Sequence, residues 1–200
     1  MRAPHDPDAV GDAAGVSLRP REFARMGVLR YFDRAGPFVA SAARAVGGAL
    51  PAPRQAVHYR LIEDGPEIIL ACLNPTETLV LCDDAQQFEA LGRQVAGRLD
   101  GCLVEQTGGL WVCAVSGGRA RELLARLGAR SALAAPGEAR TGRLADLAVT
   151  SVGVQQGEIL LVVERVYRDH LAAWIEATLD DFERSAQPPG VPPTASDVPD

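Results

Sequence analysis

The sequence predicts an α+β fold in which antiparallel sheets are built from repeated hairpin-helix units. Two observations predict it: short apolar segments occur in pairs separated by turn-forming residues, and an amphipathic helical segment follows each pair. Strands joined by tight turns are antiparallel and need no crossover helix. We therefore expect the helices to cover one face of the sheet, as in a two-layer domain.

The first unit comprises two short strands at residues 16–19 and 25–31, followed by a helix at residues 37–46. The helical segment places its apolar side chains three or four residues apart, which is the spacing of one helix face. Gly47 and Gly48 follow directly, and glycine commonly ends a helix. We expect the two strands to form a hairpin next to this helix.

The second unit has a strand at residues 57–62 and a hairpin of residues 68–73 and 78–82, connected by the turn-forming sequence Asn-Pro-Thr-Glu. Asp84 and Gln87 then resemble a capping box, whose side chains bond the first backbone N–H groups of a helix. The predicted helix ends at residue 99, and its apolar face consists of Ala85, Phe88, Leu91, Val95 and Leu99.

The third unit has strands at residues 102–107 and 110–116, with a Gly-Gly pair between them. Two glycines between two β-prone segments are a common signal for a two-residue hairpin turn. A helix is predicted at residues 119–127, and a loop at residues 129–142 follows it.

The fourth unit has strands at residues 147–153 and 158–164 and a helix at residues 168–186. Residues 159–163 are all apolar, which predicts a strand buried on both faces. Its second face must therefore meet helices, another sheet or another protein. The predicted apolar face of the helix consists of Leu171, Trp174, Ile175, Leu179 and Phe182.

These units define one domain at residues 16–186. Residues 1–15 are poor in apolar side chains, and residues 187–200 are rich in proline. Such segments cannot bury enough apolar surface to fold. We therefore expect both ends to be disordered tails.

The composition excludes several classes of function. The net charge of −6 argues against nucleic-acid binding, which needs a basic surface. The chain contains no lysine, so it cannot form a Schiff base. No apolar run has the length of a membrane helix, and the first residues lack the apolar core of a signal peptide. We expect a cytoplasmic protein with reduced cysteines that binds neither nucleic acid nor membranes.

No metal site is predicted on this chain. The cysteines are widely separated, without a Cys-x-x-Cys pair. His5, His58 and His170 fall in a tail, a strand and a helix. The cysteines are interpreted as small apolar side chains: Cys72, Cys82, Cys102 and Cys113.

Ser116 lies between a predicted strand and a predicted helix, where a nucleophile could stand. The serine of an α/β-hydrolase needs a glycine two residues earlier, and Ala114 occupies that position. We therefore interpret Ser116 as the N-cap of the helix. Gly117 and Gly118 leave open an anion site at the helix start. No catalytic and no cofactor-binding residue is predicted.

Charged residues gather in two places near the C-terminal end of the domain. The last helix carries four carboxylates: Glu176, Asp180, Asp181 and Glu183. Those at positions 176, 180 and 183 share the face opposite the apolar one, which indicates a solvent-exposed surface. Arg165, Tyr167 and Arg168 follow Glu164 at a strand end. Tyrosine and arginine are favoured at protein interfaces, so these residues either contact a partner or pack against the strand end.

The segments 140–149 (RTGRLADLAV) and 163–174 (VERVYRDHLAAW) resemble the gamma subunit of heterotetrameric sarcosine oxidase. That family shows an arginine, an aromatic residue two positions later and a tryptophan where Arg165, Tyr167 and Trp174 stand. Further segments that resemble the family are residues 38–51, 73–77 and 115–124. The similarity extends over about residues 16–185, and Thr78 and Gly118 depart from it as in a divergent member.

The resemblance implies a fold similar to the folate-binding module of glycine-cleavage T protein. It also implies an accessory, non-catalytic gamma subunit. The whole complex would oxidatively demethylate sarcosine to glycine, with hydrogen peroxide and formaldehyde or methylene-tetrahydrofolate as further products. FAD, FMN, NAD and tetrahydrofolate are expected on the partner subunits, which are the alpha, beta and delta chains. As the gamma chain has no assigned catalytic residue, none is carried over.

Two alternatives stand beside this interpretation. The first is a free-standing folate-binding factor of the T-protein type, against which the missing lysine and the missing Lys-Gly-Cys-Tyr sequence argue. The second is an interaction module of another complex. A neighbouring gene for a large flavoprotein would favour the oxidase subunit over that module.

Overall fold

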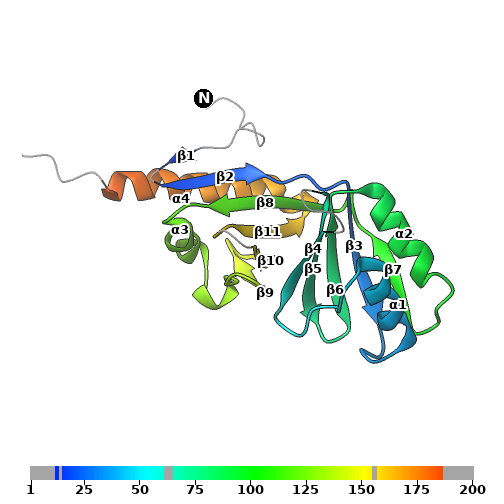
Figure 1. Ribbon diagram of the computed structural model, residues 1–200. Coiled ribbons are helices and arrows are strands. Elements are labelled where there is room, and N and C mark those ends of the chain that lie inside the picture. The colour runs from blue at the N-terminus through cyan, green and yellow to red at the C-terminus, as the bar shows by residue number, and fades with distance from the viewer. Residues whose placement is uncertain (1–11, 14, 61–64, 155–156, 187–200) are drawn as a thin grey trace, which may run out of the picture.

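The computed structural model describes residues 12–13, 15–60, 65–154 and 157–186. Two antiparallel sheets pack face to face, and a pair of helices covers the outer face of each (Figure 1). The predicted α+β class with antiparallel sheets is confirmed. The two predicted layers are wrong, because the second sheet makes the arrangement helix, sheet, sheet, helix.

The six-stranded sheet is formed by the first two strands of the described chain and by its last four. Its strands, in spatial order, are β1 (Asp12–Ala13), β2 (Val16–Pro20), β8 (Leu110–Ser116), β11 (Ile159–Glu164), β10 (Leu147–Gly153) and β9 (Ala139–Leu144). Its helices are α3 (Ala120–Leu127) and α4 (Arg168–Ala186). Strand β1 lies within the segment predicted as an N-terminal tail. Residues 1–11 and 187–200 lie outside the described residues, so the two tails stay predictions.

The five-stranded sheet is formed by the middle of the chain. Its strands, in spatial order, are β4 (Ala56–Arg60), β5 (Glu67–Asn74), β6 (Glu77–Cys82), β3 (Arg25–Tyr31) and β7 (Gly101–Glu105). Its helices are α1 (Pro37–Val46) and α2 (Ala85–Val95), which lie on its outer side in Figure 1. Within the described ranges no helix is both long and apolar enough to cross a bilayer.

Strand β11 shows how the layers are held together. Ile159, Leu161 and Val163 face α3 and α4, whereas Leu160 and Val162 face the other sheet. All five side chains are buried. The prediction that this strand is covered on both faces is confirmed, and the cover on its second face is the five-stranded sheet.

Two of the four predicted hairpins form, namely β5–β6 and β10–β11. The other two are wrong, because β2 and β8 belong to the six-stranded sheet whereas β3 and β7 belong to the five-stranded one. A two-residue hairpin turn needs positive φ at its first central residue. Neither Gly108 nor Gly109 has positive φ, and the chain there passes from one sheet to the other.

Helix α2 starts as predicted but ends one turn early. The Asp84 carboxylate accepts a hydrogen bond from the backbone N–H of Gln86 at 2.8 Å and so caps the helix. The reciprocal part of the capping box is wrong, because Gln87 Oε1 accepts from the Cys82 thiol instead. The helix ends at Val95 and Gly97 takes positive φ, which leaves Leu99 outside the helix with 96% of its surface exposed.

Two other local predictions need correction. The loop expected at residues 129–142 contains a short 3-10 helix, Arg130–Ala132, and the beginning of strand β9. Trp174 was expected on the buried face of the last helix, but 51% of its surface is exposed. The other four residues of that face are buried, because they point into the core beneath the six-stranded sheet.

Candidate functional site

The cysteines lie as expected for apolar side chains, with one exception. Cys72, Cys82 and Cys113 are buried, whereas Cys102 is exposed on edge strand β7. Burial raises the pKa of the Cys113 thiol to about 12. Among the described residues no group of three histidine, cysteine, aspartate or glutamate side chains could hold a metal ion.

Ser116 does not cap helix α3. The N-cap is Arg119, which makes no capping hydrogen bond with its side chain. Gly117 has a φ of 108°, and a Cβ there would lie 2.3 Å from the carbonyl oxygen of Gly15. The positive φ and the close approach of the turn residue Gly15, which directly precedes β2, therefore explain the glycine.

The charged residues near the C-terminal end divide between packing and exposure. Arg165 Nε donates to the carbonyl oxygen of Gly108 at 3.0 Å, and its backbone N–H donates to that of Gly109 at 2.7 Å. Arg165 therefore packs against the crossover between the sheets, as the strand-end alternative predicted. Arg168 lines a small pocket of about 140 Å³ together with Arg165. Tyr167 is exposed, as are Asp180 and Asp181 on α4.

A second exposed surface was missed by the sequence. Phe32 is 85% exposed and Leu99 is 96% exposed. The backbone N–H of Phe32 donates to the carbonyl oxygen of Asp100 at 3.1 Å, so the two apolar side chains belong to neighbouring segments. We call Phe32, Leu99 and the exposed Cys102 the apolar patch. The signal for it was present, since Leu99 lies beyond the glycine that ends α2.

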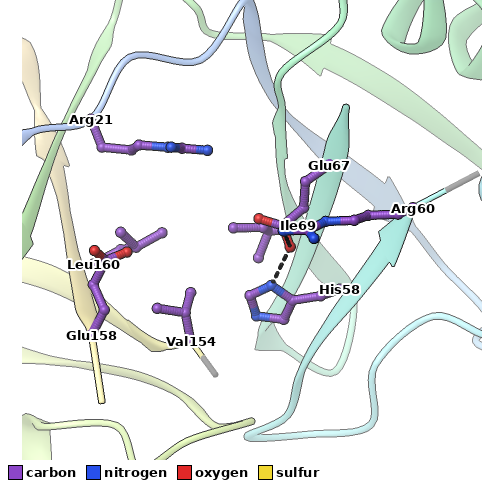
Figure 2. A pocket seen from close by; sticks show the side chains of 8 residues that line it. All are labelled: Arg21, His58, Arg60, Glu67, Ile69, Val154, Glu158 and Leu160. Carbon is purple, nitrogen blue, oxygen red and sulfur yellow. Dashed lines mark hydrogen bonds and ion pairs between the residues drawn. The ribbon is translucent and has the colours of Figure 1, made fainter. Parts of the chain in front are cut away.

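One concave site is a cleft of about 520 Å³ between residues of the two sheets (Figure 2). One wall comes from β4 and β5 of the five-stranded sheet, and the other from the six-stranded sheet and the segment after β2. The floor is apolar and the walls are charged. The lining residues are Arg21, His58, Arg60, Glu67, Ile69, Val154, Glu158 and Leu160.

The β4 wall carries a histidine-carboxylate pair. His58 Nδ1 lies 3.1 Å from Glu67 Oε1, and both side chains are largely buried, with 13% and 16% exposed. Arg60 lies directly opposite Glu67 in the strand pairing and donates to the same oxygen at 3.5 Å. Residues on one face of adjacent strands meet in this way. Because a carboxylate only accepts, a proton lies on Nδ1 in this contact, and in the neutral form of the ring Nε2 is then the acceptor.

His58 Nε2 is buried and has no hydrogen-bond partner among the described residues. A buried polar atom left without a partner costs about 1–3 kcal/mol. Such an atom on a residue that lines a cleft is a candidate contact for a bound molecule or ion. The sequence predicts only that His58 lies in a strand and holds no metal, and no local pattern predicts a cleft beside it.

The opposite wall supplies one cation and one further carboxylate. Arg21 Nη2 donates to both carboxylate oxygens of Asp83, at 2.9 and 3.2 Å. Glu158 is half-buried and makes no side-chain hydrogen bond or ion pair within the described residues. Figure 2 shows Arg21 and Glu158 entering the cleft across from His58 and Glu67. The described lining contains no hydroxyl, thiol or amine nucleophile, so the arrangement is suited to binding a charged ligand.

Comparison with known proteins identifies the fold. A chain of heterotetrameric sarcosine oxidase from Corynebacterium sp. U-96, in complex with pyrrole 2-carboxylate, superimposes with a TM-score of 0.71 and 19% identity. The match covers 87% of this chain and 88% of that chain. Glycine cleavage system aminomethyltransferase T from Bartonella henselae matches with a TM-score of 0.62 and 18% identity, over 86% of this chain and 47% of that chain.

No family model and no curated protein sequence matches this chain. At such identities the likeness to the two solved structures concerns the fold. The chain spans about half of the aminomethyltransferase but nearly the whole of the oxidase chain. The chain thus has the fold that these two proteins share.

Proposed function

We propose that this chain is the accessory gamma-type subunit of a heterotetrameric flavin-dependent sarcosine oxidase. The observation that carries the proposal is the reciprocal coverage, 87% of this chain against 88% of the oxidase chain. Two chains that cover each other almost completely are of nearly equal length, so the oxidase match concerns a whole subunit. The aminomethyltransferase match, at 47% of that chain, concerns a part of a larger protein.

The surface of the chain supports a role in assembly. Isolated exposed apolar side chains are normal, but adjacent large ones that are almost fully exposed mark interaction sites. Phe32 and Leu99 in the apolar patch meet that description. Tyr167, with 44% of its surface exposed, and Val166, with 80% exposed, form a second accessible pair. Obligate subunit interfaces are large and more apolar than transient ones.

In this proposal the chemistry takes place on the partners. The alpha, beta and delta subunits would carry FAD, FMN, NAD and tetrahydrofolate. The complex would convert sarcosine to glycine, with hydrogen peroxide and formaldehyde or methylene-tetrahydrofolate as the other products. The gamma-type chain would contribute contacts that hold the large subunits in place and would act in the cytoplasm.

The test is coexpression with flavoprotein subunits encoded beside its gene, followed by size-exclusion chromatography with detection at a flavin absorbance wavelength. Coelution of this chain with yellow protein is expected. A colourless monomer that ignores those subunits would contradict the proposal. Direct titration of that monomer with tetrahydrofolate then distinguishes a free-standing folate-binding factor from an interaction module of another complex.

Variants locate the contact. Replacing Phe32 and Leu99 together by serine is expected to abolish coelution while leaving the fold intact, since both side chains are exposed. Tyr167→Ala tests the second surface in the same assay. Unchanged coelution of Tyr167→Ala would remove that residue from the interface. The matched control is Arg93→Ser, because Arg93 is an exposed residue on α2.

A further inference from the structure

Two residues that line the cleft carry a hydrogen-bond acceptor without a donor in the described part of the chain. The acceptors are His58 Nε2, which is buried, and the Glu158 carboxylate, which is half-buried. His58 lies on β4 of the five-stranded sheet and Glu158 directly precedes β11 of the six-stranded sheet, and the two side chains enter the cleft from opposite walls (Figure 2). Buried acceptors are normally satisfied, so His58 Nε2 favours a ligand with an N–H or O–H donor, and the carboxylate of Glu158 favours a cationic one.

An ammonium group supplies what these two acceptors lack. It carries three N–H donors and a positive charge, which a carboxylate binds through strong charge-assisted hydrogen bonds. The Glu67 carboxylate does not take this role, because His58 and Arg60 already use it. A carboxylate or phosphate placed between these two acceptors would instead be repelled by Glu158.

The rim of the cleft carries cationic hydrogen-bond donors instead of acceptors. Arg21 and Arg60 are more exposed than His58 and Glu67, with 43% and 54% of their side chains accessible. Arg21 uses Nη2 for Asp83, and its Nε and Nη1 have no recorded acceptor among the described residues. A guanidinium binds a second carboxylate through such remaining donors. The cleft thus has acceptors in its depth and donors at its mouth.

We propose that this cleft binds a small amino acid in its zwitterionic form, with the ammonium group between His58 and Glu158 and the carboxylate on Arg21. Ile69, Val154 and Leu160 form the floor, so a short apolar side chain fits it best. The proposal goes beyond the assembly role and does not depend on it. If the chain is not an oxidase subunit, the same cleft would still bind an amino acid, and the chain would then be a non-catalytic amino-acid sensor.

The binding test uses the purified full chain and isothermal titration calorimetry. Glycine and alanine are the zwitterionic probes, and acetate and methylammonium each carry one of the two charges. Saturable binding of both amino acids is expected, with each single-charge probe weaker by roughly tenfold or more, as for the loss of one charged contact. Binding of acetate or methylammonium as tight as that of glycine would overturn the zwitterion proposal.

Matched variants test the residues. Glu158→Gln and His58→Gln are each expected to weaken glycine binding by about tenfold or more. Glu89→Gln makes the same carboxylate-to-amide change on α2, where Glu89 is 57% exposed, and should bind like the parent chain. Unchanged binding in Glu158→Gln would overturn the proposal, as would the absence of saturable binding in the parent chain.

A second readout follows His58 itself. Long-range nitrogen–proton NMR spectra distinguish the two neutral tautomers, and His58→Gln assigns the signal. The proton is expected on Nδ1, and Nε2 should shift on glycine addition but not on acetate addition. If the chain is soluble only in complex with its partner subunits, the glycine titration by calorimetry is carried out on the complex with the parent chain and on the complex with Glu158→Gln. An unaltered Nε2 signal with saturating glycine would contradict the proposed contact.

Discussion

The layer between the two sheets has two regions, a closed centre and an open edge. At the centre, apolar side chains from both sheets form one buried cluster, which contains Leu79 and Leu81 of one sheet and Val112 and Val162 of the other. At the edge the sheets separate, and charged side chains line the cleft. Leu160 belongs to both regions, since it lies in the central cluster and in the cleft floor.

The difference shows how the fold separates stability from binding. Burial of apolar surface stabilises a protein in proportion to area and needs no specific geometry. Charged groups tolerate burial only when they are paired or reach solvent. They therefore occur where the sheets part, and the central cluster holds the sheets that position them.

A change at the centre should have the largest effect. Leu81 is fully buried, and Leu81→Ala is expected to lower the free energy of unfolding by about 2–5 kcal/mol through lost burial and a cavity. Urea denaturation measures it. Leu99→Ala makes the same change at a residue that is 96% exposed and should stay within about 0.5 kcal/mol of the parent chain. Equal effects of the two variants would refute the assignment of the core.

The second-largest effect on stability is expected where Gly153 of β10 packs against the backbone of Ala135. A Cβ on Gly153 would lie 1.9 Å from the carbonyl oxygen of Ala135, so Gly153→Ala forces the 135–138 segment away from β10. We expect a loss of about 1–3 kcal/mol in the free energy of unfolding. Gly92→Ala is the control. A Cβ there would lie 3.7 Å from Leu103 inside a helix, so stability should rise by about 0.5–1 kcal/mol.

Of the two glutamates that line the cleft, Glu67 should contribute more to the free energy of unfolding than Glu158. Glu67→Gln weakens the contacts to His58 and Arg60 and is expected to cost about 1–2 kcal/mol in the free energy of unfolding. Glu158→Gln removes a carboxylate without a described partner and should change it by less than about 0.5 kcal/mol. Thermal unfolding of both variants checks this. A larger cost for Glu158→Gln would mean that this residue serves stability rather than binding.

The smallest effect concerns pH. The backbone N–H of Ala135 and then the Arg140 guanidinium hold the pKa of Glu138 below its usual value of 4.5. A carboxyl whose pKa is lower in the folded state stabilises the fold above the unfolded pKa, and this contribution is lost as the pH falls through the folded value. Glu138→Gln should therefore flatten the fall in stability below about pH 4.5. The free energy of unfolding is measured by urea titration at several pH values. If it falls as steeply at acid pH in Glu138→Gln as in the parent chain, Glu138 does not contribute to the pH dependence of stability.

Local patterns in the sequence determined most elements of this protein. The apolar spacing predicted the last helix at residues 168–186, where α4 runs from Arg168 to Ala186, because a helix face repeats every three to four residues. The Asn-Pro turn predicted the β5–β6 hairpin, and five consecutive apolar residues predicted that β11 is covered on both faces. Each of these features depends on residues close together in the chain.

Only the tertiary structure decided how the strands divide into two sheets and what lies between them. Strands β2 and β3, like β7 and β8, are neighbours in sequence, yet each pair is split between the sheets. Such choices depend on the total burial of all strands, which no local pattern encodes. The cleft exists for the same reason: Arg21, His58 and Glu158 are distant in the chain, and the separation of the two sheets at one edge brings them to one site.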